Sequence, residues 1–213
     1  AAQTATTQQQ LADRKNVEVK TERQTIAIDQ GKPVPEVDTS SYLTGLFGAD
    51  DRSGFYRLLT VDGNTGTVVL SSPVTQIRGK TVFTVADVRI AQEDGTAATY
   101  PSLFIAVCGA DDGHSAVKLC LIDATSLEIL KQSDETLADT TELLRSNDSF
   151  YVLVKIDGSC YVGMYDKNLT LLRRSTVAVK PTTPLNVVSK GLLVTAADGT
   201  PLLLDMQTLE GLW

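Results

Sequence analysis

From Tyr42 onward, short apolar runs alternate along the chain with polar clusters of Asp, Gly and Asn. Runs such as "FYVLVKI" (150–156) and "LLVTAA" (192–197) are apolar at nearly every position and are bounded by turn residues. This pattern is typical of many short β-strands that are buried on both faces, not of helices. Asp-Gly dipeptides between the runs, at 157–158 and 198–199, predict tight hairpins.

One element recurs four times: an apolar strand that ends in Asp, a short turn and a second strand. The four aspartates are Asp62, Asp123, Asp166 and Asp205, at intervals of 61, 43 and 39 residues. Intervals near 40 are typical of one propeller blade. We expect each Asp to accept hydrogen bonds from its own backbone in an Asx-turn.

The repeat predicts an all-β, β-propeller-like domain of about four four-stranded antiparallel blades. A small sheet with two apolar faces cannot cover either face alone, so neighbouring copies must stack. Whether the ring is complete, open or finished by a neighbour is left undecided by the pattern. The predicted units are about 42–72, 73–132, 133–175 and 176–213. The predicted strands are about 141–146, 149–156, 159–165 and 169–175 in the third unit, and about 183–188, 191–196, 200–204 and 209–213 in the fourth.

Two segments carry further structural expectations. The first interval is about 20 residues longer than the others, so an extra hairpin or extended loop is expected at Lys80–Ser102. The segment "DETLADTTELLR" (134–145) could instead form a helix, although it has few apolar residues.

Residues 1–41 differ in texture from the rest of the chain. They contain no aromatic residue and are rich in Gln, Thr, Lys, Asp and Pro, which predicts a polar tail or linker. One strand is expected at 24–29. The chain begins with Ala, and its first residues lack the basic start and apolar core of a signal peptide, so we expect a mature form or a cut segment.

Composition excludes several classes of function. The formal net charge is −7 and the pI is about 4.7, which argues against a nucleic-acid partner. No apolar run approaches the roughly 20 residues of a membrane-spanning helix. Cys108, Cys120 and Cys160 lie in apolar runs, have no zinc-site spacing and are expected to be buried as small hydrophobic side chains.

Candidate chemistry is sparse. His114 is the only histidine, and no catalytic or nucleotide-binding motif is present, so no catalytic residue, metal site or cofactor is predicted. The candidate partner-binding residues lie in two equivalent loops, "GADDR" (48–52) and "GADDGHS" (109–115); simple turn formation and weak cation binding are the alternatives for the aspartates. These residues are Asp50, Asp51, Arg52, Asp111, Asp112 and His114.

We expect a non-enzymatic, exported or envelope-associated module that uses its loops or channel to bind a protein or an envelope component. The alternative is a hydrolase or oxidoreductase with a site in the channel. Its polar residues would be Thr140, Thr141, Glu142, Thr182 and Thr183. A third reading is a spacer or oligomerisation cap, with oligomerisation through the N-terminal region.

Several stretches resemble known families. "DGNTGTVV" (62–69) and "DMQTLEGLW" (205–213) resemble the last hairpin of quinoprotein-type and surface-layer-type β-propeller blades. Quinoprotein blades typically carry a docking Trp each, whereas Trp213 is the only Trp here, so the resemblance implies the strand layout and no cofactor. The polar head and "YDKNLTLLRRSTVAVKPTTP" (165–184) resemble the C-terminal domain of the spirochaete 83/100-kilodalton antigens. That resemblance implies an exported, immunogenic protein without a known catalytic role.

Overall fold

The computed structural model describes residues 28–29, 32–33, 39–49, 54–92, 94–109 and 116–213. The chain forms two compact units, Ala1–Tyr42 and Leu43–Trp213. In the first unit, β1 (Ile28–Asp29) pairs with β2 (Lys32–Pro33) in an antiparallel hairpin, and β1 lies within the predicted strand at 24–29. Within the described ranges, no helix has the length and apolar character needed to cross a membrane.

The described part of the second unit is built of antiparallel β-strands. The helix considered for residues 134–145 does not form, because this segment holds a short strand, a turn and the start of another strand. The strands are β3 (Tyr42–Gly48), β4 (Phe55–Asp62), β5 (Val68–Ser71), β6 (Ile77–Ala91), β7 (Ala97–Cys108), β8 (Lys118–Asp123), β9 (Ile129–Gln132), β10 (Thr136–Leu137), β11 (Leu144–Ser146), β12 (Ser149–Ile156), β13 (Ser159–Tyr165), β14 (Leu171–Arg174), β15 (Asn186–Val188), β16 (Gly191–Thr195) and β17 (Pro201–Leu204).

These strands form three sheets in chain order, made of β3–β9, β10–β14 and β15–β17. We divide the seven-stranded first sheet into two parts, and we call β3–β5 sheet 1, β6–β9 sheet 2, β10–β14 sheet 3 and β15–β17 sheet 4. Sheets 1 and 2 are joined at a corner, where β4 pairs with β6 over only two residue pairs. In sheet 4, a bridge between Leu204 and Gly211 supplies the position of a fourth strand. Four groups of strands thus follow one another along the chain, and the first two groups share one continuous sheet.

The predicted Asx-turns are confirmed at all four repeated aspartates. In each turn, Oδ1 of the Asp accepts a hydrogen bond from the backbone N–H two residues later. The donor–acceptor distances are 2.8 Å at Asp62, 2.6 Å at Asp123, 2.9 Å at Asp166 and 2.8 Å at Asp205. The turn then places one residue in the left-handed region, Gly66 in the first copy and a buried leucine, such as Leu127 (φ 58°), in the others.

Alternating side chains of β12 show why the sheets stack. Phe150, Val152 and Val154 point into a core that they share with sheet 2. Tyr151 and Leu153, on the opposite face of the same strand, belong to a second core that they share with sheet 4. Both faces of the sheet are buried, as the continuous apolar runs predicted, because alternate residues of a strand point to opposite faces.

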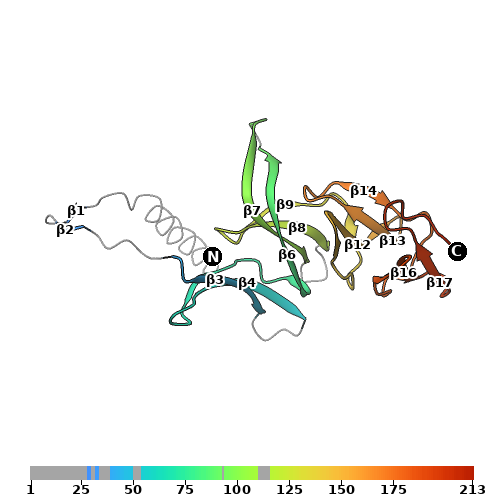
Figure 1. Ribbon diagram of the computed structural model, residues 1–213, viewed down its shortest axis with the longest axis horizontal. Helices are drawn as coiled ribbons and strands as arrows, with labels where there is room; N and C mark the ends of the chain where they lie inside the picture. Colours follow the sequence, from blue (N-terminus) through green and yellow to red (C-terminus); the bar gives the residue numbers. More distant parts are fainter. Residues whose placement is uncertain (1–27, 30–31, 34–38, 50–53, 93, 110–115) are drawn as a thin grey trace, which may run out of the picture. The chain divides into compact units, whose positions relative to one another are not determined.

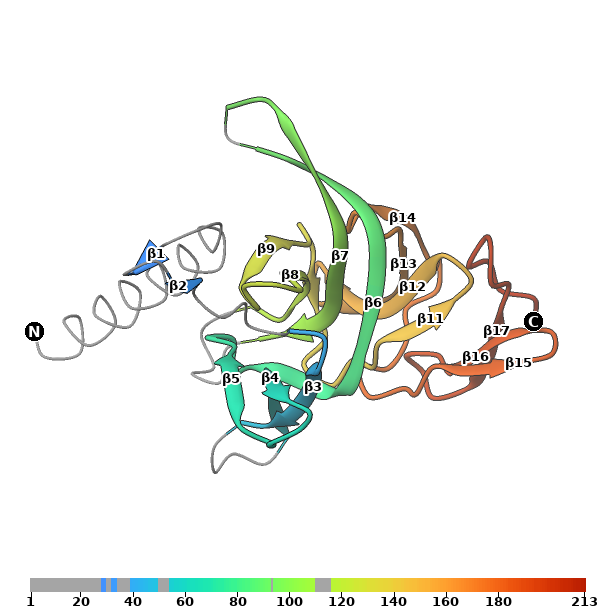
Figure 2. The same ribbon diagram turned by 60° about the vertical axis from the view of Figure 1, so that its left-hand side comes forward.

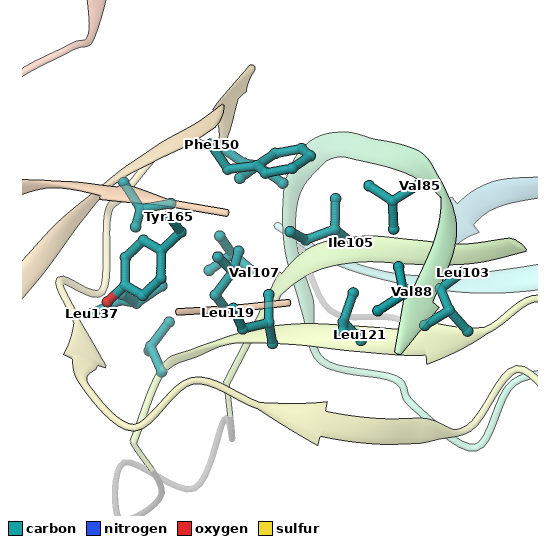
Figure 3. Close-up of a cluster of buried hydrophobic side chains, with 14 of the residues drawn as sticks. Val85, Val88, Leu103, Ile105, Val107, Leu119, Leu121, Leu137, Phe150 and Tyr165 are labelled. Atoms are coloured by element: carbon teal, nitrogen blue, oxygen red, sulfur yellow. The ribbon is translucent and has the colours of Figure 1, made fainter. Parts of the chain in front are cut away.

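Three cores hold the four sheets together. The first lies between sheets 1 and 2, the second between sheets 2 and 3, and the third between sheets 3 and 4. Figure 3 shows the second core, in which Ile105 and Val107 of β7 lie between Phe150 of β12 and the side chains of Leu119 and Leu121 on β8. Four sheets with three cores make an all-β, open, propeller-like stack.

The cysteines and the segments between sheets follow the same plan. Cys108, Cys120 and Cys160 are free and buried, as expected. The segments that connect sheets are bonded to both of the sheets they join. Leu137 pairs with Val154 of sheet 3 and donates its N–H to the carbonyl of Val117, at 2.8 Å, just before β8 of sheet 2.

Candidate functional site at the long hairpin

The hairpin β6–β7 is the largest departure from the repeat. It occupies the segment Lys80–Ser102, where the sequence predicted an extra hairpin or loop. Strand β7 pairs with β8 only from Leu103 to Cys108. Beyond this point, residues 86–91 and 97–102 continue as a two-stranded ribbon past sheet 2 (Figures 1 and 2), which we call the ribbon. Insertions into one unit of a repeat protein often form its binding face.

The ribbon bends where Pro101 faces Asp87. Proline has no N–H to donate to a strand partner, and the pairing of β6 with β7 skips these two residues. Asp87 takes a left-handed conformation, with φ 52°, which Asp tolerates better than most residues. After the bend, Val88 and Ile90 are buried in the second core. The ribbon is therefore packed on one face and exposed on the other.

Two cations of sheet 3 cover the outer edge of β6. Arg145 Nη1 donates to the Thr84 carbonyl at 3.2 Å, and Lys167 Nζ donates to the Ala86 carbonyl at 3.0 Å. The Arg145 guanidinium also lies 5.6 Å from the centre of the Phe150 ring. Basic side chains at a sheet edge are a common protection against pairing with another chain. This edge is thus closed to a further strand.

The ribbon ends in an acidic turn. Asp94 Oδ1 accepts hydrogen bonds from the hydroxyl and the backbone N–H of Thr96, at 2.6 and 2.9 Å, and these bonds lower the pKa of the Asp94 carboxyl. Gly95 has φ 81°, a conformation that glycine adopts at little cost. The same three-residue sequence and bonds recur at 198–200. The end of the ribbon is therefore an ordered turn that carries a negative charge.

Two hollows flank the ribbon. The first, of about 510 Å³, lies between the ribbon and β9, and we call it the inner hollow. It is lined by Ile90, Ala91, Gln92, Asp94, Tyr100 and Leu130. The second, of about 520 Å³, includes Arg145 and Lys167 and is crossed by their bonds to β6. Both hollows have a mixed apolar and polar lining. Of these two, the inner hollow is the one that no Lys or Arg crosses with a hydrogen bond, among the described residues.

The outer edge of β7 is open along the ribbon. In the part of the chain that the structure describes, Ala97–Ser102 pairs with β6 on one side and with no strand on the other. Its side chains are small or half-exposed, and none is a Lys or Arg. The edge spans six residues, about 20 Å at roughly 3.4 Å per residue. The two edges of the ribbon thus differ, since β6 is covered and β7 is not.

All six residues predicted to bind a partner lie outside the described residues. They are Asp50, Asp51, Arg52, Asp111, Asp112 and His114. The structure describes the ends of both loops: the Ala49 N–H donates to the Phe55 carbonyl at 2.9 Å, and the Gly109 N–H donates to the Gln76 carbonyl at 3.0 Å. The role of these loops in binding stays a prediction.

Four of the five residues named for a channel site make structural hydrogen bonds: Thr140, Thr141, Glu142 and Thr183. The buried Thr141 hydroxyl accepts the Leu153 N–H at 2.7 Å, and Thr183, at the equivalent position of the next unit, accepts the Thr195 N–H at 2.8 Å. Two further bonds link sheet 3 to sheet 4: the Thr140 hydroxyl donates to the Pro181 carbonyl at 2.6 Å, and a Glu142 carboxylate oxygen accepts the Leu185 N–H at 3.3 Å.

Several important residues were missed by sequence reasoning. The hydroxyls of Ser133 and Ser175 each accept a strand N–H at 3.1 Å, and the signal that could have found them was their spacing of 42 residues. The cations that cover β6 gave no such signal, because their acceptors lie 61 and 81 residues away in the sequence. Among the described residues, no three His, Cys, Asp or Glu side chains are grouped to hold a metal ion.

Comparisons with known proteins place the chain in a family. The crystal structure of BamB from Moraxella catarrhalis matches with 13% sequence identity and a TM-score of 0.38, over 88% of this chain and 73% of that one. Comparison with curated proteins finds no match. The family model of the Borrelia P83/100 protein matches residues 1–185, which include the polar head and the run 165–184, and it confirms the resemblance to the spirochaete antigens. The chain therefore belongs to the Borrelia P83/100 protein family.

Proposed function

We propose that this domain is a non-catalytic binding module that captures an extended segment of a partner protein along the open edge of β7. The observation that carries the proposal is the difference between the two ribbon edges. Arg145 and Lys167 cover β6, while Ala97–Ser102 of β7 has no outer strand partner among the described residues. An extended peptide can add to such an edge through backbone hydrogen bonds.

The inner hollow supplies selectivity in this proposal. Alternate side chains of an added strand point to one face, so the partner segment can place one apolar side chain beside Tyr100 and Leu130. The exposed carboxylate of Asp94 borders the same hollow. We therefore expect the partner segment to be extended, with an apolar residue for the hollow and a Lys or Arg near it.

The absence of catalysis and the location are part of the same proposal. Thr141 and Thr183 make structural hydrogen bonds, which leaves their hydroxyls poorly suited to a reaction in a channel. An exported or envelope location accords with the resemblance to spirochaete antigens. The partner is accordingly a protein or another component of the cell envelope.

Selection of short random peptides displayed on phage against the full chain tests the proposed function, with calorimetry on the peptides that are recovered. Ala91→Trp should fill the inner hollow and weaken binding about tenfold or more, which is at least about 1.4 kcal/mol. Val177→Trp is the control, because Val177 is 40% exposed and does not line the hollow. Peptides whose affinity is the same for wild type and Ala91→Trp, or that bind as helices, would contradict the proposal.

A further inference from the structure

Two of the three cysteines lie close together on adjacent strands of sheet 2. Cys108 of β7 pairs with Lys118, two residues before Cys120 of β8, so the two cysteines are diagonal neighbours. Both are free thiols that point into the first core, where they are 5% and 0% exposed. Cys160 belongs to the third core instead. Of the three cysteines, only Cys108 and Cys120 thus share a strand pair, a sheet face and a core.

Sheet 3 contains the same diagonal. Gly163 of β13 is equivalent to Cys120 of β8, because the carbonyl of the preceding residue in each strand accepts the N–H of a buried serine at 2.8 Å. Val154 of β12 pairs with the residue two positions before Gly163, so it stands to Gly163 as Cys108 stands to Cys120. Val154 also points into the core toward the preceding sheet, as Cys108 does.

The two positions of this diagonal lie within the span of a disulfide. A Cβ atom on Gly163 would lie 2.7 Å from Cγ1 of Val154. Because a carbon–carbon bond adds about 1.5 Å, the two Cβ positions are at most about 4.2 Å apart. The Cβ atoms of a disulfide are about 3.5–4.5 Å apart. In sheet 2, the same diagonal carries two thiols, and the thiol of Cys120 is the main cause that raises the pKa of Cys108.

We propose that Cys108 and Cys120 form a disulfide bond when the chain folds in an oxidising compartment. The Cys108 thiolate attacks a small disulfide such as oxidised glutathione, and one glutathione leaves as its thiolate. The Cys120 thiolate then attacks the Cys108 sulfur and releases the second glutathione. Overall, the two cysteine thiols give up two protons and two electrons, which convert the oxidised glutathione into two thiols. The exported location proposed above supplies such conditions, because disulfides persist in compartments such as the bacterial periplasm.

The bond closes the segment 108–120 between β7 and β8. This segment includes the candidate partner-binding residues Asp111, Asp112 and His114. A disulfide stabilises a protein mainly by restricting the unfolded chain. It therefore holds together the two strands that carry this loop, and its reduction should lower the stability of the domain.

Refolding of the full chain in a mixture of reduced and oxidised glutathione tests the bond. Refolding is used because the first core buries both thiols in the folded protein. After alkylation of free thiols in denaturant, mass spectrometry should find only Cys160 alkylated, together with a peptide pair that links Cys108 to Cys120. Protein refolded in dithiothreitol should have all three cysteines alkylated. The urea midpoint of the oxidised protein should be higher by about 1 M.

Cys160→Ala is the matched control, and it should keep both the bond and the gain in urea midpoint. Cys108→Ala and Cys120→Ala should each lack the bond and have the same urea midpoint with and without oxidised glutathione. A wild type that refolds to its native circular dichroism spectrum with three free thiols overturns the proposal. So does a bond to Cys160, or an oxidised protein that is less stable than the reduced one or lacks its strands. Failure of the peptide-binding experiment leaves this result unchanged, because the ribbon lies outside the segment 108–120.

Discussion

Replacing Thr141 by Val should destabilise the protein measurably, and the structure gives the size of the effect. Thr141 is 8% exposed, and its hydroxyl accepts the N–H of the fully buried Leu153 at 2.7 Å. Valine has nearly the same shape but no acceptor, so the Leu153 N–H would be buried without a partner. An unsatisfied buried donor costs about 1–3 kcal/mol, which corresponds to a Tm lower by about 4–8 °C for a loss of 2 kcal/mol in a protein of this size.

Thr183→Val provides a graded comparison. The N–H that Thr183 accepts belongs to Thr195, which is half-exposed, so water can replace the lost acceptor in part. The expected loss is about 1 kcal/mol, near the lower limit for an unsatisfied donor. The free energy of unfolding from urea titration should therefore decrease more for Thr141→Val than for Thr183→Val, with similar slopes against urea.

Thr141→Ser is the matched control for the hydroxyl. It keeps the acceptor and loses only a buried methyl group, which costs about 0.8 kcal/mol. The reasoning is refuted if Thr141→Val is as stable as the wild type, or if Thr141→Ser is less stable than Thr141→Val. Such a result would exclude a structural role for the Thr141 hydroxyl and would favour the alternative of a site in the channel.

Three further predictions concern acid stability, thiols and the repeated turns. The backbone N–H groups three and two residues after Asp205 lower its pKa from 3.8 in the folded protein, so the unfolded state binds more protons and stability falls as the pH drops below about 4. Asp205→Asn should show a smaller fall in urea midpoint over this range, and identical pH profiles would contradict the argument. The thiol of Cys120, together with burial, raises the pKa of Cys108. An aromatic disulfide reagent at pH 8 should therefore label Cys108 only in denaturant, and rapid labelling of Cys108 in the native protein would contradict this prediction. Leu127→Ala should lower the free energy of unfolding from urea titration by about 2–5 kcal/mol, because Leu127 is fully buried. Gly66→Ala, at the same left-handed turn position, should lower it by about 1–2 kcal/mol. Equal losses of stability in the two variants would contradict this argument from burial.

Local chemistry explains what could be predicted from the sequence. An Asp that bonds to its own backbone two residues later needs no information from elsewhere in the chain, and all four repeated aspartates form such turns. The continuous apolar runs likewise identify strands with two buried faces. In sheet 3, β12 and β13 have the predicted bounds, 149–156 and 159–165. The sequence shows these bounds directly, because an Asn-Asp turn precedes β12 and an Asp-Gly turn separates the two strands.

Contacts between distant segments could not be predicted. Sheets 1 and 2 were expected as separate blades, yet β4 and β6 pair at a corner, and only the register of the two strands in space determines this. The ribbon was expected as an extra hairpin or loop, but its bend depends on Pro101 facing Asp87 across the hairpin. Arg145 reaches a carbonyl of β6 61 residues away, and the equivalent position in sheet 4 is Val187, so the repeat contains no information about this bond.

The stack also explains where a binding element can be placed. In a repeat protein, stability is close to a sum over units and the contacts between neighbours. Sheets 2 and 3 each contribute to two cores, while sheets 1 and 4 contribute to one. The ribbon extends from sheet 2, and sheet 3 holds it through Arg145 and Lys167. An open strand edge binds well only when its support is rigid, and the ribbon is built on the two sheets that are covered on both faces.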